Sequence, residues 1–306
     1  MTETQVQEAT QSRRLLARQR KLRSFGRLTK EFRTDTAGVI GGVVLLSFIV
    51  IAIATPLLFS SDELDRTLQI DQPKLASPSG EHLLGTDDKR RDMLAVLLWG
   101  SRTSLSVGLA AAVFAITIGA LIGICSGYFG RWVDAVLSRI EEWFLVIPTL
   151  PLAIVLVTVL GGSLRTIIIV IGLTSWAGSA RLIRAQTLTV KQRLYVERSR
   201  GLGAPHRHII RRHIFPNVMP IILANLTLTV PVAILSEATL SFLGIGSFER
   251  ESWGKTLEAA HAASAIRLGA WWYFLPVGIL ITTVVLSFTM VGNAVERVVN
   301  PKLRER

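Results

Sequence analysis

The feature that most constrains this chain of 306 residues is a series of long apolar stretches without a charged residue. A helix needs about 20 such residues to cross the hydrocarbon core of a bilayer, where its backbone polar groups must be hydrogen-bonded internally. Half of all residues are hydrophobic, which is too apolar for an ordinary soluble domain. Five stretches are long enough to span, at residues 37–59, 103–130, 143–164, 214–236 and 268–294.

A sixth stretch, residues 166–180, is short when read strictly. We expect its helix to continue past Arg181 and Arg184 toward Val190, with both arginine side chains reaching the cytoplasmic headgroups. The sequence therefore predicts an all-α integral membrane protein with six transmembrane helices.

Basic residues are unevenly distributed along the chain, whose formal net charge is +12. They gather before the first stretch, between residues 181 and 212, and after the last stretch. With six spans these three groups lie on one side of the membrane, which the positive-inside rule makes the cytoplasm. We therefore expect a multi-pass protein of the cell membrane, inner or plasma, with both termini cytoplasmic and the loop of residues 60–101 outside. Charge placed in this way indicates topology rather than nucleic-acid binding.

Leucine and phenylalanine recur at near-helical spacing among the arginines and lysines of residues 15–33. This pattern is typical of an amphipathic helix lying in the membrane interface, although a solvated basic tail has a similar composition.

Several signatures of chemistry are missing from the sequence. No G-x-x-x-x-G-K-[ST] motif is present to bind the phosphates of ATP, and no H-E-x-x-H or G-x-S-x-G motif indicates an enzyme. Cys125 is the single cysteine, so an internal disulfide is impossible and we interpret it as a small packing residue. His206, His208 and His213 lie among arginines, which disfavour a bound cation. We expect no catalytic residue, cofactor or metal in this chain.

Residues 195–217 form a strongly basic segment between two apolar stretches. Gly203 suits the left-handed position that follows a helix, and Pro205 suits the start of the next one. We expect a second short helix over residues 206–215 that ends near Pro216. A loop that only fixes topology would need the basic charge but not a Gly-Ala-Pro break.

This segment resembles the cytoplasmic coupling loop of ATP-binding-cassette (ABC) importer permeases, whose motif is roughly E-A-A-x-x-x-G followed by I-x-L-P. Glu197, Gly203 and Pro216 hold the matching places, while Arg198 and Ser199 replace the two alanines. The residues before Pro216 also depart from the motif, since histidine and phenylalanine replace its isoleucine and leucine. The resemblance implies a docking element for an ATPase subunit, formed by Glu197, Arg198, Ser199, Arg200, Gly201, Leu202, Gly203, Ala204 and Pro205.

Three further segments are similar to the peptide-type permeases of this superfamily. The first is residues 82–94, H-L-L-G-T-D-D-K-R-R-D-M-L, which match the family pattern L-G-T-D-x-x-G-R-D except that Arg90 stands where glycine is usual. It leads into residues 100–105, G-S-R-T-S-L, which match the pattern G-x-R-x-S-L. The second segment is residues 237–246, E-A-T-L-S-F-L-G-I-G, directly after the apolar stretch 214–236. The third is residues 292–301, G-N-A-V-E-R-V-V-N-P, at the end of the matched region. Because glycine adopts positive φ easily and arginine seldom does, the sequence does not determine the backbone conformation at Arg90.

These matches identify the chain as a member of the dipeptide, oligopeptide or nickel class of ABC permeases, in its shorter-loop subunit form. The implied fold is that of a type I ABC importer transmembrane domain with a cytoplasmic coupling helix. The implied organisation is a cytoplasmic tail at 1–35, the first transmembrane helix and an external loop at 36–102, the core permease domain at 103–300 and a cytoplasmic end at 301–306.

The resemblance also implies partners: a homologous second permease, two ATPase subunits that bind ATP and Mg²⁺, an external substrate-binding protein and the lipid membrane. Substrate identity stays open among peptides, nickel chelates and other small solutes. An ATP-independent six-span channel or secondary transporter is the alternative class, but it would be expected to show intramembrane charges or a selectivity-filter loop. Without a paired set of catalytic residues, an intramembrane enzyme is disfavoured.

The translocation path is expected to be lined by small and apolar residues. Glu237 is an acid directly after a long apolar run, and such a residue usually faces the bundle interior or a watery path, although it could also be an interfacial acid. Ordinary helix packing is the other explanation for each remaining candidate. The path candidates are Ser175, Trp176, Asn225, Thr227, Thr229 and Glu237.

Overall fold

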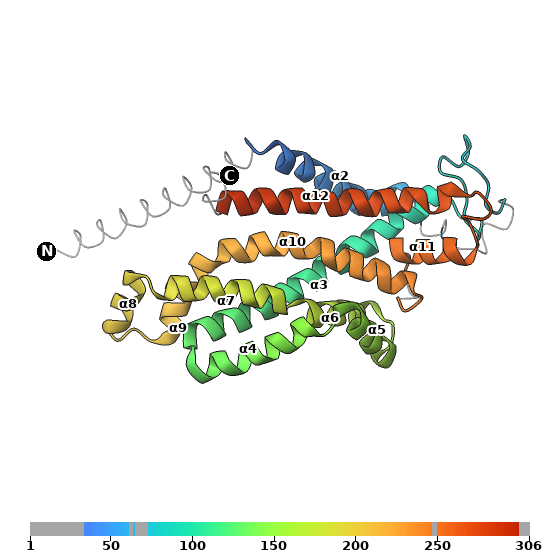
Figure 1. Cartoon of the computed structure of the whole chain (residues 1–306). Coiled ribbons are helices and arrows are strands. Elements are labelled where there is room, and N and C mark those ends of the chain that lie inside the picture. Colours follow the sequence, from blue (N-terminus) through green and yellow to red (C-terminus); the bar gives the residue numbers. More distant parts are fainter. Residues whose placement is uncertain (1–33, 61–63, 65–72, 247–249, 300–306) are drawn as a thin grey trace.

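The computed structural model describes residues 34–60, 64, 73–246 and 250–299, and the regular elements in these ranges are helices. The predicted amphipathic helix of residues 15–33 and the segment 301–306 lie outside the described residues. The elements in chain order are α2 (Thr36–Leu58), α3 (Met93–Phe129), α4 (Arg131–Val146), α5 (Thr149–Leu160), α6 (Leu164–Ser175), α7 (Ala177–Lys191), α8 (Leu194–Gly201), α9 (His206–Ile209), the π-helix η2 (Ile210–Ile214), α10 (Phe215–Phe242), α11 (Trp253–Ala262), the 3₁₀-helix η3 (Trp271–Tyr273) and α12 (Leu275–Val299) (Figure 1).

Six spans are present if each of two bent helix pairs is counted as one, as predicted. The third span is not the straight helix expected over 143–164: α4 and α5 meet at an angle of 92°. Pro148 caps α5 there and has no backbone N–H with which to continue α4. The fourth span bends by 47° between α6 and α7, at Trp176.

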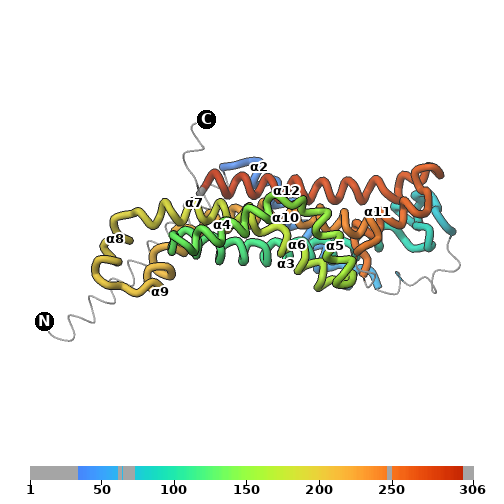
Figure 2. The backbone as a smooth tube through the Cα atoms, turned by 60° about the horizontal axis from the view of Figure 1, so that its bottom comes forward, coloured from blue at the N-terminus to red at the C-terminus, as the bar shows by residue number. Residues whose placement is uncertain are grey.

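Helix α3 is the centre of the bundle, with α7 and α10 packed closely along it (Figure 2). Three glycines at four-residue spacing, Gly119, Gly123 and Gly127, form the α3 face against α7. A β-carbon at Gly123 would come within 2.6 Å of the Ala180 carbonyl oxygen. Small residues at this spacing let two membrane helices approach until their backbones touch, which replaces the hydrophobic driving force that lipid does not supply.

Two arginines of α7 pair with acids of α4, and α7 continues past both of them to Lys191, as predicted. Arg184 donates two hydrogen bonds of 2.6 Å to Asp134 of α4, and Arg181 donates one of 2.8 Å to Glu141 of the same helix. Whether the two side chains also reach the headgroups stays a prediction. Asp134 and Glu141 lie seven residues apart and so share one face of α4, where they pair with the cations across the helix contact.

The loop of residues 73–92 packs on α11 and η3 at one end of the bundle (Figure 1). Buried Arg91 donates a hydrogen bond of 2.7 Å to Asp87 and another of 2.9 Å to Glu251. Burial raises the pKa of the Asp87 carboxyl, although Arg91 opposes this. For Glu251, burial acts in the same direction, but Arg91 and Lys255 outweigh it and lower the pKa. The loop is thus tied by charge to the residues that precede α11.

Arg90 has φ +67° within this loop. The arginine therefore occupies the left-handed conformation for which the family's glycine is suited. This costs a side-chain-bearing residue about 1 kcal/mol or more.

The opposite end of the bundle holds α8 and α9, the start of α2 and the end of α12 (Figure 1). There Arg297 donates a hydrogen bond of 2.9 Å to Asp35, the residue that caps α2. The first and last described residues consequently lie at the same end as the segment 195–217.

Candidate functional site

The coupling loop is built around a helix end with a defined hydrogen-bond pattern. Helix α8 ends at Gly201, and Gly203 follows with φ +77°, the left-handed conformation predicted for it. The Gly203 N–H donates to the Arg200 carbonyl (3.0 Å), and the Ala204 N–H donates to the Ser199 carbonyl (3.1 Å). These two bonds form a Schellman motif, which fixes the direction in which the chain leaves α8.

The second helix of the loop does not stop at Pro216. Residues His206–Phe242 form one continuous helical segment through α9, η2 and α10. In η2 the Phe215 N–H donates to the Ile210 carbonyl, a π-type bond, and the side chain of Asn217 donates to the His213 carbonyl at 2.7 Å. The helix continues through Pro216, which falls in the first turn after the π-helix, where a proline is tolerated.

The loop is attached to the bundle through aromatic contacts at the end of α3. The hydroxyl of buried Tyr128 is hydrogen-bonded to Nδ1 of His206 at 2.9 Å, and the two rings meet edge to face. The guanidinium of Arg200 lies over the same tyrosine ring, 5.8 Å from its centre. Both helices of the loop are therefore positioned by Tyr128, a residue that the sequence reasoning did not single out.

A small hydrophobic core supports this attachment. Val196 of α8 and Ile209 of α9 are fully buried, and they pack in a cluster with Ile183 of α7 and Ile124 of α3. These two positions are the apolar anchors of an otherwise exposed loop. Since an isolated helix as short as α8 is unstable in water, its shape depends on this packing.

The outer surface of the loop carries apolar and basic side chains together. Leu202 is 88% exposed and Leu194 is 69% exposed, which is unusual on a basic segment. Glu197 and Arg198 are exposed too, and Glu197 has no ion-pair partner within the described part of the chain. This surface can insert a leucine into an apolar groove while its cations contact acidic groups on the groove's edge.

The path candidates are dispersed rather than gathered in this single chain. Trp176 lies at the bend between α6 and α7, next to Ser175, and packs on Phe144. The Asn225 amide donates a hydrogen bond of 2.8 Å to Ser179 of α7, so it links two helices. Thr227 and Thr229 donate to carbonyls of their own helix, at 2.7 and 2.8 Å. Their role in a path stays a prediction.

Glu237 lies in the interior, 2% exposed, where three helices meet. It accepts hydrogen bonds from Ser104 of α3 (3.1 Å) and from Ser241 (2.8 Å). Ser104 in turn accepts from the backbone N–H of Trp253, at the start of α11 (3.1 Å). Glu237 is twelve residues from Asn225, about 18 Å along α10, so the two are not neighbours. The G-x-R-x-S-L and E-x-x-L-S-F-L-G segments thus meet in space, which their separation in sequence did not reveal.

A helical membrane bundle that carries a structured helix-turn-helix at one end has the architecture of a transport permease. The sequence profile of the family described as "Binding-protein-dependent transport system inner membrane component" matches residues 115–305. The chain belongs to this family.

Curated relatives extend the match to most of the chain. The dipeptide transport system permease protein DppC of Alkalihalophilus pseudofirmus is 34% identical over 276 residues, covering 90% of this chain and 89% of the relative. The oligopeptide transport system permease protein OppC of Bacillus subtilis is 37% identical over 277 residues, covering 90% and 88%. The corresponding OppC of Haemophilus influenzae is 35% identical over 277 residues, covering 89% and 86%.

A solved structure has the same fold. A chain of the methionine ABC transporter MetNI, in an inward-facing conformation, is similar with a TM-score of 0.55. The match covers 68% of this chain and 98% of that chain, at 19% sequence identity. The likeness supports the predicted ABC importer fold of the transmembrane helices.

Proposed function

We propose that this protein is the transmembrane permease subunit of an ATP-driven, binding-protein-dependent importer of dipeptides or oligopeptides. Relatives of nearly the same length are named dipeptide and oligopeptide permeases, and they support the peptide substrate. The observation that carries the proposal is the loop itself: an exposed leucine and exposed cations are held on a turn of fixed geometry at the end of the bundle. A permease without an ATP-binding motif needs such a contact with an ATPase chain.

The complex would contain four kinds of partner. A homologous permease forms the other half of the path, two ATPase subunits bind ATP and Mg²⁺, an external protein delivers the substrate, and lipid surrounds the helices. The end of the bundle where the coupling loop and the first and last described residues lie (Figure 1) then faces the cytoplasm.

The loop offers two routes for transmitting motion. Closure of the ATPases on ATP would shift the surface formed by residues 197–205. One route runs through the Tyr128–His206 hydrogen bond to α3, the central helix. The other runs along the continuous segment His206–Phe242 to the far end of α10, where Glu237 joins α3 and α11. Both routes reach α3, so the bundle would move as a unit between inward-open and outward-open states.

Reconstitution of the chain with its partner permease, ATPases and binding protein in vesicles tests this function. We expect ATP-dependent uptake of a labelled oligopeptide, and loss of uptake in Leu202→Ser with weaker recovery of the ATPase. Leu83→Ser is the matched control, because Leu83 is 67% exposed in the loop at the other end of the bundle. Uptake that persists without ATPase subunits would rule out the proposal.

A further inference from the structure

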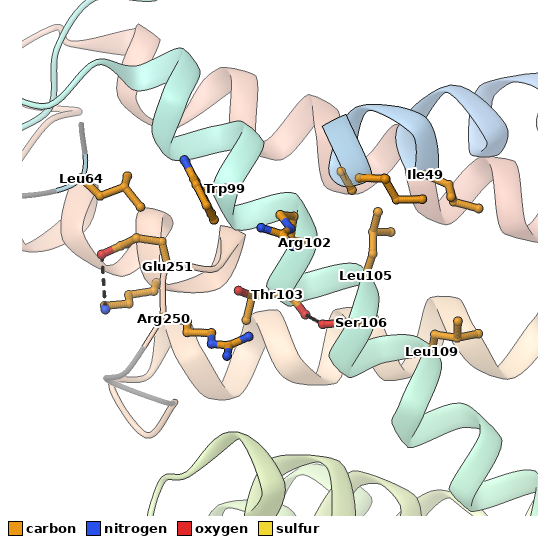
Figure 3. A pocket seen from close by; sticks show the side chains of 13 residues that line it. Ile49, Leu64, Trp99, Arg102, Thr103, Leu105, Ser106, Leu109, Arg250 and Glu251 are labelled. Carbon is orange, nitrogen blue, oxygen red and sulfur yellow. Dashed lines mark hydrogen bonds and ion pairs between the residues drawn. The ribbon is translucent and has the colours of Figure 1, made fainter. Parts of the chain in front are cut away.

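A cavity of about 890 Å³ lies between α2, α3 and the start of α11, at the end of the bundle away from the coupling loop (Figure 3). One part of its lining is apolar and the other part is charged. The apolar part comes from α2 and α3 and includes Ile49, Ile53 and Leu109. The charged part holds Arg102, Arg250, Glu251 and Lys255.

The cavity crosses the boundary between headgroups and hydrocarbon. Arg102 is the last charged residue of α3, since residues 103–129 of that helix carry no charge. Leu109, the deepest lining residue on α3, lies seven residues beyond Arg102, about 10 Å further along the helix. An occupant therefore needs a polar end at Arg102 and an apolar body that reaches about two helical turns into the membrane.

The apolar part of the cavity is also open at the outer surface of this chain. Ile53 is 70% exposed and Leu109 is 49% exposed, and both belong to uncharged stretches of membrane helices. A peptide substrate, by contrast, needs a path closed to the hydrocarbon, because its backbone polar groups cannot be left unpaired there.

The charged rim favours an anion. The single carboxylate, Glu251, already accepts a hydrogen bond from Arg91 and pairs with Lys255 at 3.4 Å. Arg102 and Arg250 have no carboxylate partner among the described residues. The guanidinium of Arg102 lies over the ring of Trp99, 5.1 Å from its centre, which holds it at the rim.

We infer that this cavity binds one anionic phospholipid, with its phosphate between Arg102 and Arg250 and an acyl chain along α2 and α3. Arginine is suited to this task because its planar fork can bind two phosphate oxygens at once. The site lies apart from the coupling loop, so it holds whether or not the proposed peptide substrate is correct. It also gives a function to Arg102, a residue of the G-x-R-x-S-L segment that makes no ion pair within the described ranges.

Native mass spectrometry of the complete transporter tests the site. The delipidated complex is offered equal amounts of phosphatidylglycerol and phosphatidylcholine with identical acyl chains. We expect one phosphatidylglycerol to be retained per copy of this chain, and its retention to fall at least about tenfold when Arg102→Gln and Arg250→Gln are combined. Lysine at both positions should keep most of the binding, since it keeps the charge. Arg267→Gln is the matched control, because Arg267 is an exposed arginine at the same end but outside the cavity.

Phosphatidylglycerol with brominated chains locates the lipid, because bromine quenches nearby tryptophan fluorescence. Part of the quenching should disappear in Trp99→Phe, and excess inorganic phosphate or oligopeptide should not restore fluorescence in the parent protein. Equal retention of both lipids, or an equal loss in Arg267→Gln, would overturn the inference. Displacement by phosphate would indicate a free-anion site, and displacement by oligopeptide would indicate a substrate site; either result also overturns it.

Discussion

Gly203→Val is expected to uncouple transport without removing the protein from the membrane. Gly203 has φ +77°, and no atom lies within 4 Å of the position that a β-carbon would occupy. The cost of a side chain is therefore conformational rather than steric. A left-handed conformation costs an L-residue about 1–2 kcal/mol, which lowers the population of this turn by a factor of about 5 to 30.

The turn has little stability in reserve. If the valine leaves the left-handed region, the two Schellman hydrogen bonds to Arg200 and Ser199 are lost, each worth about 1 kcal/mol. Helix α8 has only eight residues, so it depends on this turn and on the burial of Val196 to keep its direction. The exposed surface around Leu202 would then no longer present one geometry to an ATPase.

The chain provides a matched control two residues away. Gly201 is the last residue of α8, also exposed and also with open space around its β-carbon position, but it has helical φ. Gly201→Val should keep α8 intact or make it slightly more stable, because valine is a better helix former than glycine, so it adds the same side chain to the docking element without disturbing the turn. Both variants are compared for amount in the membrane, recovery of the ATPase on purification and ATP-dependent uptake. Normal ATPase recovery and uptake in Gly203→Val would refute the reasoning, and the loop would then be only a topological anchor.

Four further predictions follow from other parts of the structure. Glu237→Gln should leave assembly intact but reduce uptake, because the amide nitrogen cannot accept a serine hydrogen bond as a carboxyl oxygen does; unchanged uptake would show that the carboxyl group is dispensable. Arg90→Gly should give the purified complex a higher unfolding temperature than Arg90→Ala, because both remove the arginine side chain and only glycine relieves about 1 kcal/mol of backbone strain; equal temperatures would contradict this. Tyr128→Phe keeps the ring but removes the bond to the loop, so ATP hydrolysis should persist while uptake per ATP falls severalfold; an unchanged ratio argues against this route. In a chain whose single cysteine is replaced by serine, Arg207→Cys should be protected from an impermeant reagent added to intact cells, and labelling there would reverse the proposed topology.

The spans could be predicted because lipid imposes a simple rule on sequence length and charge. The left-handed Gly203 was predictable for a similar reason, since few residues tolerate its conformation. Most of helix α4 was not predicted as part of a span, because its charged residues are not expected in a helix that contacts lipid. Two of those acids, Asp134 and Glu141, are neutralised by arginines of α7 about fifty and forty residues later, and single-sequence hydropathy contains no information about such a partner.

The effects of two prolines were not predicted from the sequence, since Pro148 lies inside the stretch 143–164, which was expected to form one span. Pro148 ends α4 and coincides with the sharpest bend in the bundle, but the angle depends on how α5 packs against α6. Pro216 was expected to end a helix, and the helix continues through it in the first turn after the π-helix. The path candidates could not be resolved from sequence, because a path between two subunits depends on a surface that the partner supplies.

The continuous helical segment His206–Phe242 connects the coupling loop with the far end of α10 and forms a lever when it moves as one body. Its 37 residues are about 55 Å long. A tilt of only about 5° about the loop end would displace Phe242 by about 5 Å, roughly the height of one helical turn. A small rotation imposed on the loop could therefore become a movement at the opposite membrane surface that is large enough to open or close an entrance. A break at Pro216 would have absorbed that rotation locally.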